Sequence, residues 1–318
     1  MKGALDVLLS APEFDLVVAV PGSSARFQPE LAVQPLIDCA SAAKPLAAFV
    51  VPEAPKALAN LTAAGIPNFR TPEACADAIA AAFVRKMPRQ LPELPQRPPA
   101  QHAVMLDELE AYGLLRQWGI PHAEAALYDG NAAASPVSFP LAVKILSRQI
   151  AHKSDIGGVA LNIANGKDLR EAASVIRANA ARAMPGADTS RLLVQSMTDS
   201  LGEVLVGYRY DAQTGPMVML AAGGILTELY QDRTQRLAPV DEETALEMIG
   251  EVKGLRALSG FRGKKKGDLK AVAQTLVRLS QLAVLKEPFV LEAEINPLLV
   301  REDGKGAVAV DALVRLAQ

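Results

Sequence analysis

The chain has 318 residues, half of them apolar, and a formal net charge of -2 at pH 7. This length is sufficient for two or three domains with hydrophobic cores. The near-neutral charge argues against a protein that binds nucleic acid or an anionic membrane by electrostatic attraction. Only 4% of the residues are aromatic, and alanine, valine and leucine supply most of the apolar content, which is typical of a helix-rich α/β protein.

Two features of the sequence favour a cytoplasmic location. Cys39 and Cys75 lie in segments with helical patterns, and we expect free thiols in a reducing compartment rather than a disulfide. The opening stretch MKGALDVLLSAPEFD is too short and too acidic for a signal peptide. In addition, no apolar run approaches the ~20 residues of a transmembrane helix.

The first 85 residues alternate short apolar runs with helical patterns. Thr71 is the expected N-cap of the last helix, with Pro72 at its first position. Because strands alternate with helices, we expect a parallel sheet with right-handed crossovers. The predicted strands are 15–22, 44–51 and 66–70, and the predicted helices are 29–43, 54–64 and 71–86.

A proline-rich segment follows at residues 86–100, KMPRQLPELPQRPPA, with five prolines. Proline removes a backbone donor and fixes φ, so neither a helix nor a strand persists there. We therefore predict a first domain at 1–85, a semi-rigid linker at 86–100 and a second domain at 101–318.

The second domain has a different pattern, with three successive strands that favour a mixed or antiparallel sheet and an α+β fold. One helix, 268–283, carries an apolar face formed by Leu269, Val272, Leu276, Leu279 and Ala283. The other predicted helices are 105–121, with Gly119 as its cap, 168–183 and 241–252. The predicted strands are 139–146, 160–163, 191–197, 202–211, 215–224, 289–300 and 307–316.

Three polar residues lie on the last two strands, which are otherwise strongly apolar. Glu294 and Asn296 are two residues apart and so share a strand face, and Asp311 lies on the neighbouring strand. Oxygen ligands of this kind suit Mg²⁺. The alternative is a strand end at which these groups meet solvent or a buried arginine such as Arg315.

Other candidates leave two interpretations open. Lys144 is the only charge in the strand FPLAVKIL, so it lies either at a solvent edge or facing an anion. Gly223 and Gly224 allow backbone N–H groups to approach phosphate, although a hairpin turn is the simpler interpretation. The cationic loop 260–268 is typical of a solvated segment, and nucleotide binding is the alternative.

Several common motifs are absent from the sequence. It has no Walker loop, no GxGxxG, no HExxH, no GxSxG and no cysteine cluster that could hold zinc. These absences argue against several common classes of enzyme.

Four segments together resemble the ATP-grasp part of NDP-forming acyl-CoA synthetases, the ADP-forming acetate–CoA ligase family. They are FPLAVKILSRQIAHKSDIGGVALNI, GEVLVGYRYDAQTGPMVMLAAGGILTELYQDRTQRLAPV, GFRG and LEAEINPLLV. The resemblance extends from about residue 104 to 316. The first domain is similar to the flavodoxin-like CoA-ligase domain of the same enzymes. The expected fold is thus an N-terminal flavodoxin-like parallel α/β domain followed by an α+β ATP-grasp domain of two subdomains.

The resemblance implies a ligase that joins a carboxylic acid to CoA with ATP and Mg²⁺, and releases ADP and phosphate through acyl phosphate and phosphohistidine intermediates. It also implies roles for single residues. Lys144 would contact the ATP phosphates, and Gln195, Ser196 and Met197 would hold adenine. Glu203 would bind ribose or metal, Gly223, Gly224 and Arg236 would support the phosphates, and Glu294, Asn296 and Asp311 would hold Mg²⁺.

The resemblance also suggests a role for His152, in the segment AHKSDIGGVALNI at 151–163. The family's histidine at this place is proposed to receive phosphate on a mobile loop. A neutral imidazole is nucleophilic near pH 7, and Lys153 can offset phosphate charge. Asp155 would orient the ring or cap the turn, and Gly157 and Gly158 would give the loop its freedom. Without the family, a lone histidine is usually an ordinary structural residue.

The chain lacks a recognisable CoA-binding Rossmann domain and a second phosphohistidine domain. We therefore expect a partner chain that carries both, with the domain order a permuted version of the succinyl-CoA synthetase β subunit. One alternative is a non-catalytic nucleotide-binding or regulatory relative, and another is an ATP-grasp ligase that joins a carboxylate to an amine. Two departures from the family pattern, Ala221 in AAGG and Thr214, bear on the ATP affinity.

Overall fold

The computed structural model describes residues 1–85, 90–95, 102–130, 132, 134–224 and 232–317. The chain separates into two compact units, Met1–Arg89 and Gln90–Gln318, and each is described by itself. No helix among the described residues is both long enough and apolar enough to cross a membrane.

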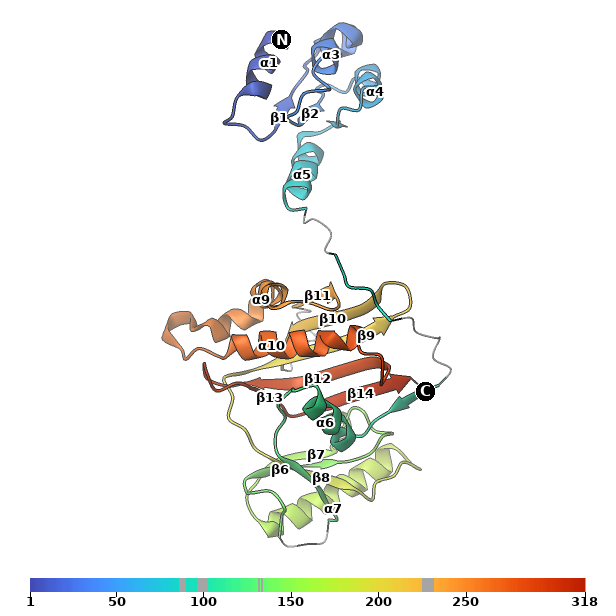
Figure 1. The fold of residues 1–318 in the computed structure, drawn as a ribbon, viewed down its shortest axis with the longest axis vertical. Coiled ribbons are helices and arrows are strands. Elements are labelled where there is room, and N and C mark those ends of the chain that lie inside the picture. Colours follow the sequence, from blue (N-terminus) through green and yellow to red (C-terminus); the bar gives the residue numbers. More distant parts are fainter. Residues whose placement is uncertain (86–89, 96–101, 131, 133, 225–231, 318) are drawn as a thin grey trace. The chain divides into compact units, whose positions relative to one another are not determined.

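The first unit is a three-stranded parallel sheet, in the order β1-β2-β3, with its helices packed around it (Figure 1). Thr71 caps the last helix, because its Oγ1 accepts a hydrogen bond from the N–H of Ala74 at 3.3 Å. The parallel pairing of the strands confirms the predicted sheet, and the hydrogen bond to Thr71 confirms the predicted N-cap. The elements are α1 (Lys2–Ser10), β1 (Val17–Ala19), α2 (Ser24–Phe27), α3 (Pro29–Ile37), β2 (Leu46–Phe49), α4 (Pro55–Ala63), β3 (Asn68–Phe69) and α5 (Pro72–Phe83).

The second unit contains a large antiparallel sheet in the order β11-β10-β9-β12-β14-β4, with β13 paired to β12. Helices α9 and α10 cover one face of this sheet (Figure 1). The elements are β4 (Ala103–Met105), β9 (Gly202–Asp211), β10 (Gly215–Ala222), β11 (Arg233–Leu237), α9 (Glu242–Glu251), α10 (Leu269–Ser280), β12 (Val290–Val300), β13 (Ala307–Ala309) and β14 (Ala312–Ala317).

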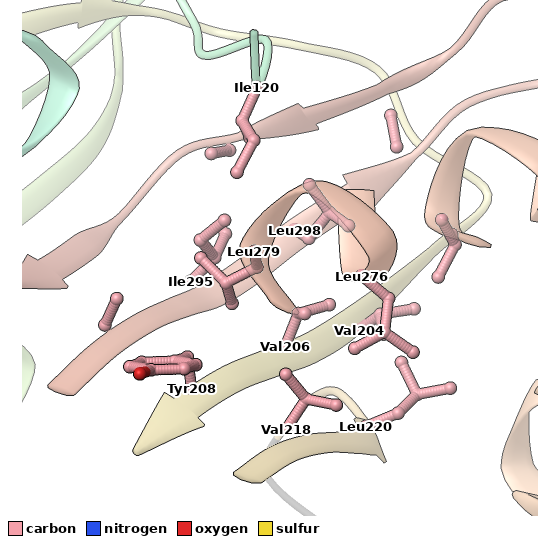
Figure 2. Close-up of a cluster of buried hydrophobic side chains, with 14 of the residues drawn as sticks. Ile120, Val204, Val206, Tyr208, Val218, Leu220, Leu276, Leu279, Ile295 and Leu298 are labelled. Carbon is pink, nitrogen blue, oxygen red and sulfur yellow. The ribbon is translucent and has the colours of Figure 1, made fainter. Parts of the chain in front are cut away.

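The main core lies between α10 and this sheet. Val272, Leu276 and Leu279 of α10 are fully buried, as the apolar face of the helix predicts. Figure 2 shows Leu276 and Leu279 next to apolar side chains of β9, β10 and β12. The opposite face of the sheet is free of these helices, and it carries Glu294, which is considered below.

A smaller sheet, in the order β5-β8-β6-β7, forms the other layer of the second unit. Its apolar face packs against Leu169, Ala173 and Ile176 of α7. Its other face carries Lys144 and Gln195, which approach side chains of α6. The elements are α6 (Glu108–Gln117), β5 (Ala125–Tyr128), β6 (Leu141–Ile145), η1 (Ser154–Ile156), β7 (Val159–Ile163), α7 (Gly166–Ala183) and β8 (Leu192–Ser196).

Several predicted boundaries were wrong. The helix predicted at 105–121 is a strand up to Met105 followed by α6, which begins only after Asp107 because that side chain forms a capping box with Glu110. The strand predicted at 307–316 is divided into β13 and β14, with Asp311 between them. The strand predicted at 66–70 is shorter. Among the described residues, the α-helices and strands that the prediction missed are α1, α2, β4, β5 and β11.

Candidate functional site

A cavity of about 220 Å³ brings together the two groups of residues singled out in the sequence. One side is the segment from Ala151 to Asp155, which contains His152. The other side contains Glu294, Asn296 and Asp311. Segments about 140 residues apart in the chain thus face each other between the small sheet and the large one.

Glu294 and Asn296 share one side of β12, as their spacing predicts. The amide Nδ2 of Asn296 donates a hydrogen bond to Glu294 Oε1 at 3.3 Å. The register between β12 and β9 shifts between Ile295 and Leu298, which leaves Asn296 and Pro297 opposite one residue of β9. Such β-bulges commonly redirect side chains next to active sites.

Asp311 reaches the same cavity because its strand is interrupted. It lies between β13 and β14, and its backbone carbonyl accepts a hydrogen bond from the N–H of Asn296 at 3.3 Å. The bulge on β12 therefore lies beside the interruption on the neighbouring strand. The two irregularities together place two carboxylates and an amide at one cavity.

This donor set fits Mg²⁺. Two carboxylates and an amide oxygen are hard oxygen ligands, and Mg²⁺ is usually held by one or two carboxylates together with substrate phosphates and water. Among the described residues, no three His, Cys, Asp or Glu side chains gather as a metal site. A metal held here would therefore depend on Asn296 or on ligands from a bound nucleotide in addition to the two carboxylates.

His152 is exposed at the mouth of this cavity, on a tight turn. The N–H of Gly158 donates to the carbonyl of Lys153 at 2.8 Å, and Gly157 has a φ of 63°. A Cβ at Gly158 would approach that carbonyl oxygen to 2.8 Å, so the two glycines are needed to close the turn. Asp155 lines the same cavity, and no hydrogen bond joins its described side chain to His152.

Glu108 lies at the centre of a buried ionic network that the sequence analysis missed. Its side chain is 2% exposed, and Oε1 accepts hydrogen bonds at 2.6 Å from both Lys144 Nζ and Tyr112 Oη. Its Oε2 lies 3.1 Å from Lys153 Nζ, which also donates to Asp311 Oδ1 at 2.9 Å. A signal was present, because Glu108 shares a helix face with Ala111, the tyrosine and Leu115, which are fully buried.

The charges of this network shift one another's pKa values. Burial alone would raise the pKa of Glu108, but the ammonium groups of Lys144 and Lys153 lower it to about 2. Burial opposes the charge of Lys153, yet the carboxylates of Glu108 and Asp311 raise its pKa. Burial and the charge of Glu108 raise the pKa of Asp311. Glu108 is therefore an anion at neutral pH, and Lys153 is a cation.

Lys144 faces an anion, which was one of the two interpretations of its position in the sequence. Its side chain is 6% exposed and pairs with Glu108, and Nζ also donates to the carbonyl of Val310. Gln195 lies on the same face and donates from Nε2 to Tyr112 Oη at 2.7 Å. Of the other two residues of the expected adenine segment, Ser196 is the last residue of β8, and Met197 follows the strand and is exposed.

Glu203 and the glycine pair form a second neighbourhood at the end of β9. The N–H of Gly223 donates to the carbonyl of Glu203 at 2.8 Å. A Cβ at Gly223 would lie 2.4 Å from that carbonyl carbon, so only glycine fits there. Gly224, with a φ of 92°, also lies beside Glu203. The segment 225–231, which continues the resembling stretch, lies outside the described residues.

Arg236 lies apart from these groups. Its guanidinium pairs with Glu251 of α9 and donates to Thr234 Oγ1 at 3.0 Å, so it is on the helix-covered face of β11. Arg233 and Gln235, on the other face of the strand, line a cavity of about 390 Å³ together with Met217 and Met219. Glu294 lines both cavities.

Comparison with known proteins places this arrangement in a family. Residues 99–316 match the model of the ATP-grasp domain family. The β subunit of acetate–CoA ligase (ADP-forming) I of Pyrococcus furiosus is 40% identical over 211 residues, which cover 65% of this chain and 90% of that subunit. The acetate–CoA ligase (ADP-forming) I of Archaeoglobus fulgidus is 39% identical, and the match covers 64% of this chain and 29% of that protein.

Solved structures agree with these matches. The acetyl-coenzyme A synthetase 1 of Candidatus Korarchaeum cryptofilum, in complex with coenzyme A and Ca-AMPCP, has a TM-score of 0.62 and 34% identity over 68% of this chain and 94% of that chain. Another structure of that enzyme, with Mg-AMPPCP and its phosphohistidine segment pointing towards the nucleotide binding site, has a TM-score of 0.55 and 33% identity over 66% of this chain and 92% of that chain. The chain therefore belongs to the NDP-forming acyl-CoA synthetase family, and the matched region is the ATP-grasp part of these ligases.

Proposed function

We propose that this chain binds Mg-ATP and accepts the γ-phosphoryl group on His152, as the ATP-grasp part of an ADP-forming acid–CoA ligase. The observation that carries the proposal is the cavity shared by His152 with Glu294, Asn296 and Asp311. A nucleophile and a set of hard oxygen ligands face the same space, as transfer from a metal-bound nucleotide requires.

The roles of the chain's own residues follow from their positions. A neutral imidazole nitrogen of His152 would attack the γ-phosphorus, and the bond to the β,γ-bridging oxygen would break to release ADP. Mg²⁺ held by Glu294, Asn296 and Asp311 would neutralise phosphate charge. Lys144 has three ammonium donors, of which Glu108 and the carbonyl of Val310 accept two, so one donor remains for a phosphate oxygen.

We also propose a second chain that supplies CoA binding and the remaining chemistry, including an acyl phosphate formed on the carboxylic acid. The support is that the match covers 90% of a relative named as a β subunit but 29% of a relative whose name gives no subunit. The first unit would be the flavodoxin-like CoA-ligase domain, in keeping with its parallel sheet. A cytoplasmic location stays a prediction, in keeping with two buried free cysteines, Cys39 and Cys75.

The test is transfer of label from [γ-³²P]ATP to the purified chain in the presence of Mg²⁺. We expect acid-labile, base-stable label that maps to His152 and is lost in His152→Asn. The exposed His102, away from the cavity, provides the matched control His102→Asn, which should retain the label. A chain that neither binds Mg-ATP nor takes up label would contradict the proposal.

The partner is tested by a tagged pull-down from the native host, with mass spectrometry of stoichiometric proteins. A co-purifying chain with a Rossmann domain and its own histidine site would support the two-chain ligase. Mg-ATP binding without label on His152, from a chain that comes down alone, would favour the non-catalytic nucleotide-binding alternative. ADP release that depends on an amine but not on CoA would favour the other ATP-grasp ligase.

A further inference from the structure

Lys153 is held by two carboxylates of very different exposure. Its Nζ lies 3.1 Å from Glu108 Oε2 and 2.9 Å from Asp311 Oδ1. The Asp311 side chain is 31% exposed and lines the cavity, whereas that of Glu108 is 2% exposed. The ammonium of Lys153 therefore contacts one carboxylate that lines the cavity and a second, that of Glu108, that is buried.

The two carboxylates differ in whether a metal in the cavity can bind them. A metal that takes an oxygen of Asp311 competes with the ammonium for the same negative charge. Glu108 is out of reach of such a metal because its side chain is buried and already accepts bonds from Lys144 and Tyr112. Only the contact with Glu108 is thus independent of what the cavity holds.

We propose that Glu108 is a positioning residue for the histidine loop, residues 151–158. It fixes Lys153 from beneath and so keeps His152 at the cavity when a metal occupies Asp311. Lys153 begins the turn that Gly158 closes by a hydrogen bond to its carbonyl. Anchoring this side chain therefore also restrains the backbone that carries His152. The inference rests on the proposed function for its chemical purpose, but the anchoring itself does not require a nucleotide.

Loop order can be measured directly by amide hydrogen exchange in the full chain. In Glu108→Gln we expect exchange at Gly157 and Gly158 to be at least ~10-fold faster than in the wild-type chain, because a buried ionic anchor restrains local opening. Protection in α10 should be unchanged. The matched variant is Asp311→Asn, which neutralises the other carboxylate on Lys153 and should produce a clearly smaller acceleration. Equal acceleration in the two variants, or a larger one in Asp311→Asn, would overturn the inference.

Glu108→Gln removes the buried carboxylate that pairs with Lys144 and Lys153, and this loss could prevent folding. A second variant therefore keeps the inference testable. Glu108→Asp keeps the charge but withdraws the carboxylate by one methylene, and it should also accelerate exchange at the two glycines. Glu171→Gln, an exposed carboxylate of α7 that pairs with Lys167, is the control that should leave the loop unchanged. If both variants fold and exchange at Gly157 and Gly158 is as slow in each as in the wild-type chain, Glu108 does not anchor the loop.

Phosphoryl transfer provides a functional measure that separates this inference from the proposed function. In Glu108→Gln we expect label transfer to His152 at saturating Mg-ATP to be at least ~10-fold slower than in the wild-type chain, because the nucleophile is less well positioned. Absence of Mg-ATP binding and label in the wild-type chain would contradict the proposed function alone. Wild-type labelling with unchanged transfer and unchanged loop exchange in Glu108→Gln would contradict this inference alone.

Discussion

Asp311 contacts the ammonium of Lys153, and it is also a proposed ligand of the metal. In Asp311→Ala we expect the affinity for Mg-ATP to fall by more than about tenfold, because even outer partners of metal ligands are commonly worth that much. Isothermal titration calorimetry measures the change. Asp303→Ala, in an exposed turn of the same hairpin, should bind as the wild type does. Unchanged affinity in Asp311→Ala would remove this residue from the metal site.

The low pKa of Glu108 makes a prediction about acid stability. Its folded pKa of about 2 lies below the ordinary value of 4.5, so its stabilisation is complete above about pH 4.5 and is lost as the pH falls towards 2. The difference in unfolding free energy between wild type and Glu108→Gln should shrink by about 3 kcal/mol over that range. The raised pKa of Asp311 works in the opposite direction. Its burial is common to both proteins, whereas the part of the shift that the charge of Glu108 causes is lost in Glu108→Gln.

Urea unfolding followed by circular dichroism at stepwise lower pH measures this difference. Glu171→Gln serves as the reference for an exposed carboxylate outside the buried network. A difference between wild type and Glu108→Gln that stays constant down to pH 2 would show that the lysines do not hold the carboxylate ionised.

At the scale of residues, the sequence was sufficient to predict the polar groups that line the cavity, but not the buried carboxylate of Glu108 that contacts Lys153. Alternation along a strand was sufficient to place Glu294 and Asn296 on one side, where both line the cavity. Glu108 was not predicted, because apolar periodicity alone does not distinguish a single carboxylate on the apolar face of a helix from one that faces solvent. Arg236 could not be assigned to a face, since its strand, β11, was not predicted.

At the scale of elements, α10 supplies the centre of the main core. Leu276→Ala removes a fully buried side chain and should lower the free energy of unfolding by about 2–5 kcal/mol. Lys270→Ala, on the exposed side of the same helix, should change it far less. Chemical denaturation of both variants measures the two effects. Equal losses would show that helix propensity rather than core packing determines the stability of this element.

Elements with strong periodicity could be predicted, and those defined by tertiary pairing could not. The apolar stripe of α10 and the capping residue Thr71 are local signals. By contrast, β5 and β11 are short edge strands whose existence depends on pairing with β8 and β10. The division of the last predicted strand at Asp311 follows from the bulge on β12, which lies opposite in space and leaves no local mark near residue 311.

At the scale of the whole molecule, the second unit has its own core and holds every residue of the candidate site. A chain that begins at Gln90 retains Leu94, which packs against that core. We expect it to fold and to bind Mg-ATP with an affinity within about twofold of the full chain, since distant sites usually act independently. Thermal unfolding and calorimetry of the two chains make the comparison. Loss of folding or binding on removal of residues 1–89 would show that the units depend on each other.

The bulge at Asn296 also bears on how distant relatives should be aligned. Side chains alternate between the two faces of a strand, so a shift of one residue turns each of them to the opposite face. A chain could keep the letters Glu, Asn and Asp but lose one residue between β12 and β14, and Asp311 would then face away from the cavity. The length of the turn at 301–306 is therefore as diagnostic of the site as the identities of its ligands. Deleting Gly304 would keep Glu294, Asn296 and Asp311 in the sequence but change the spacing that brings Asp311 to the cavity.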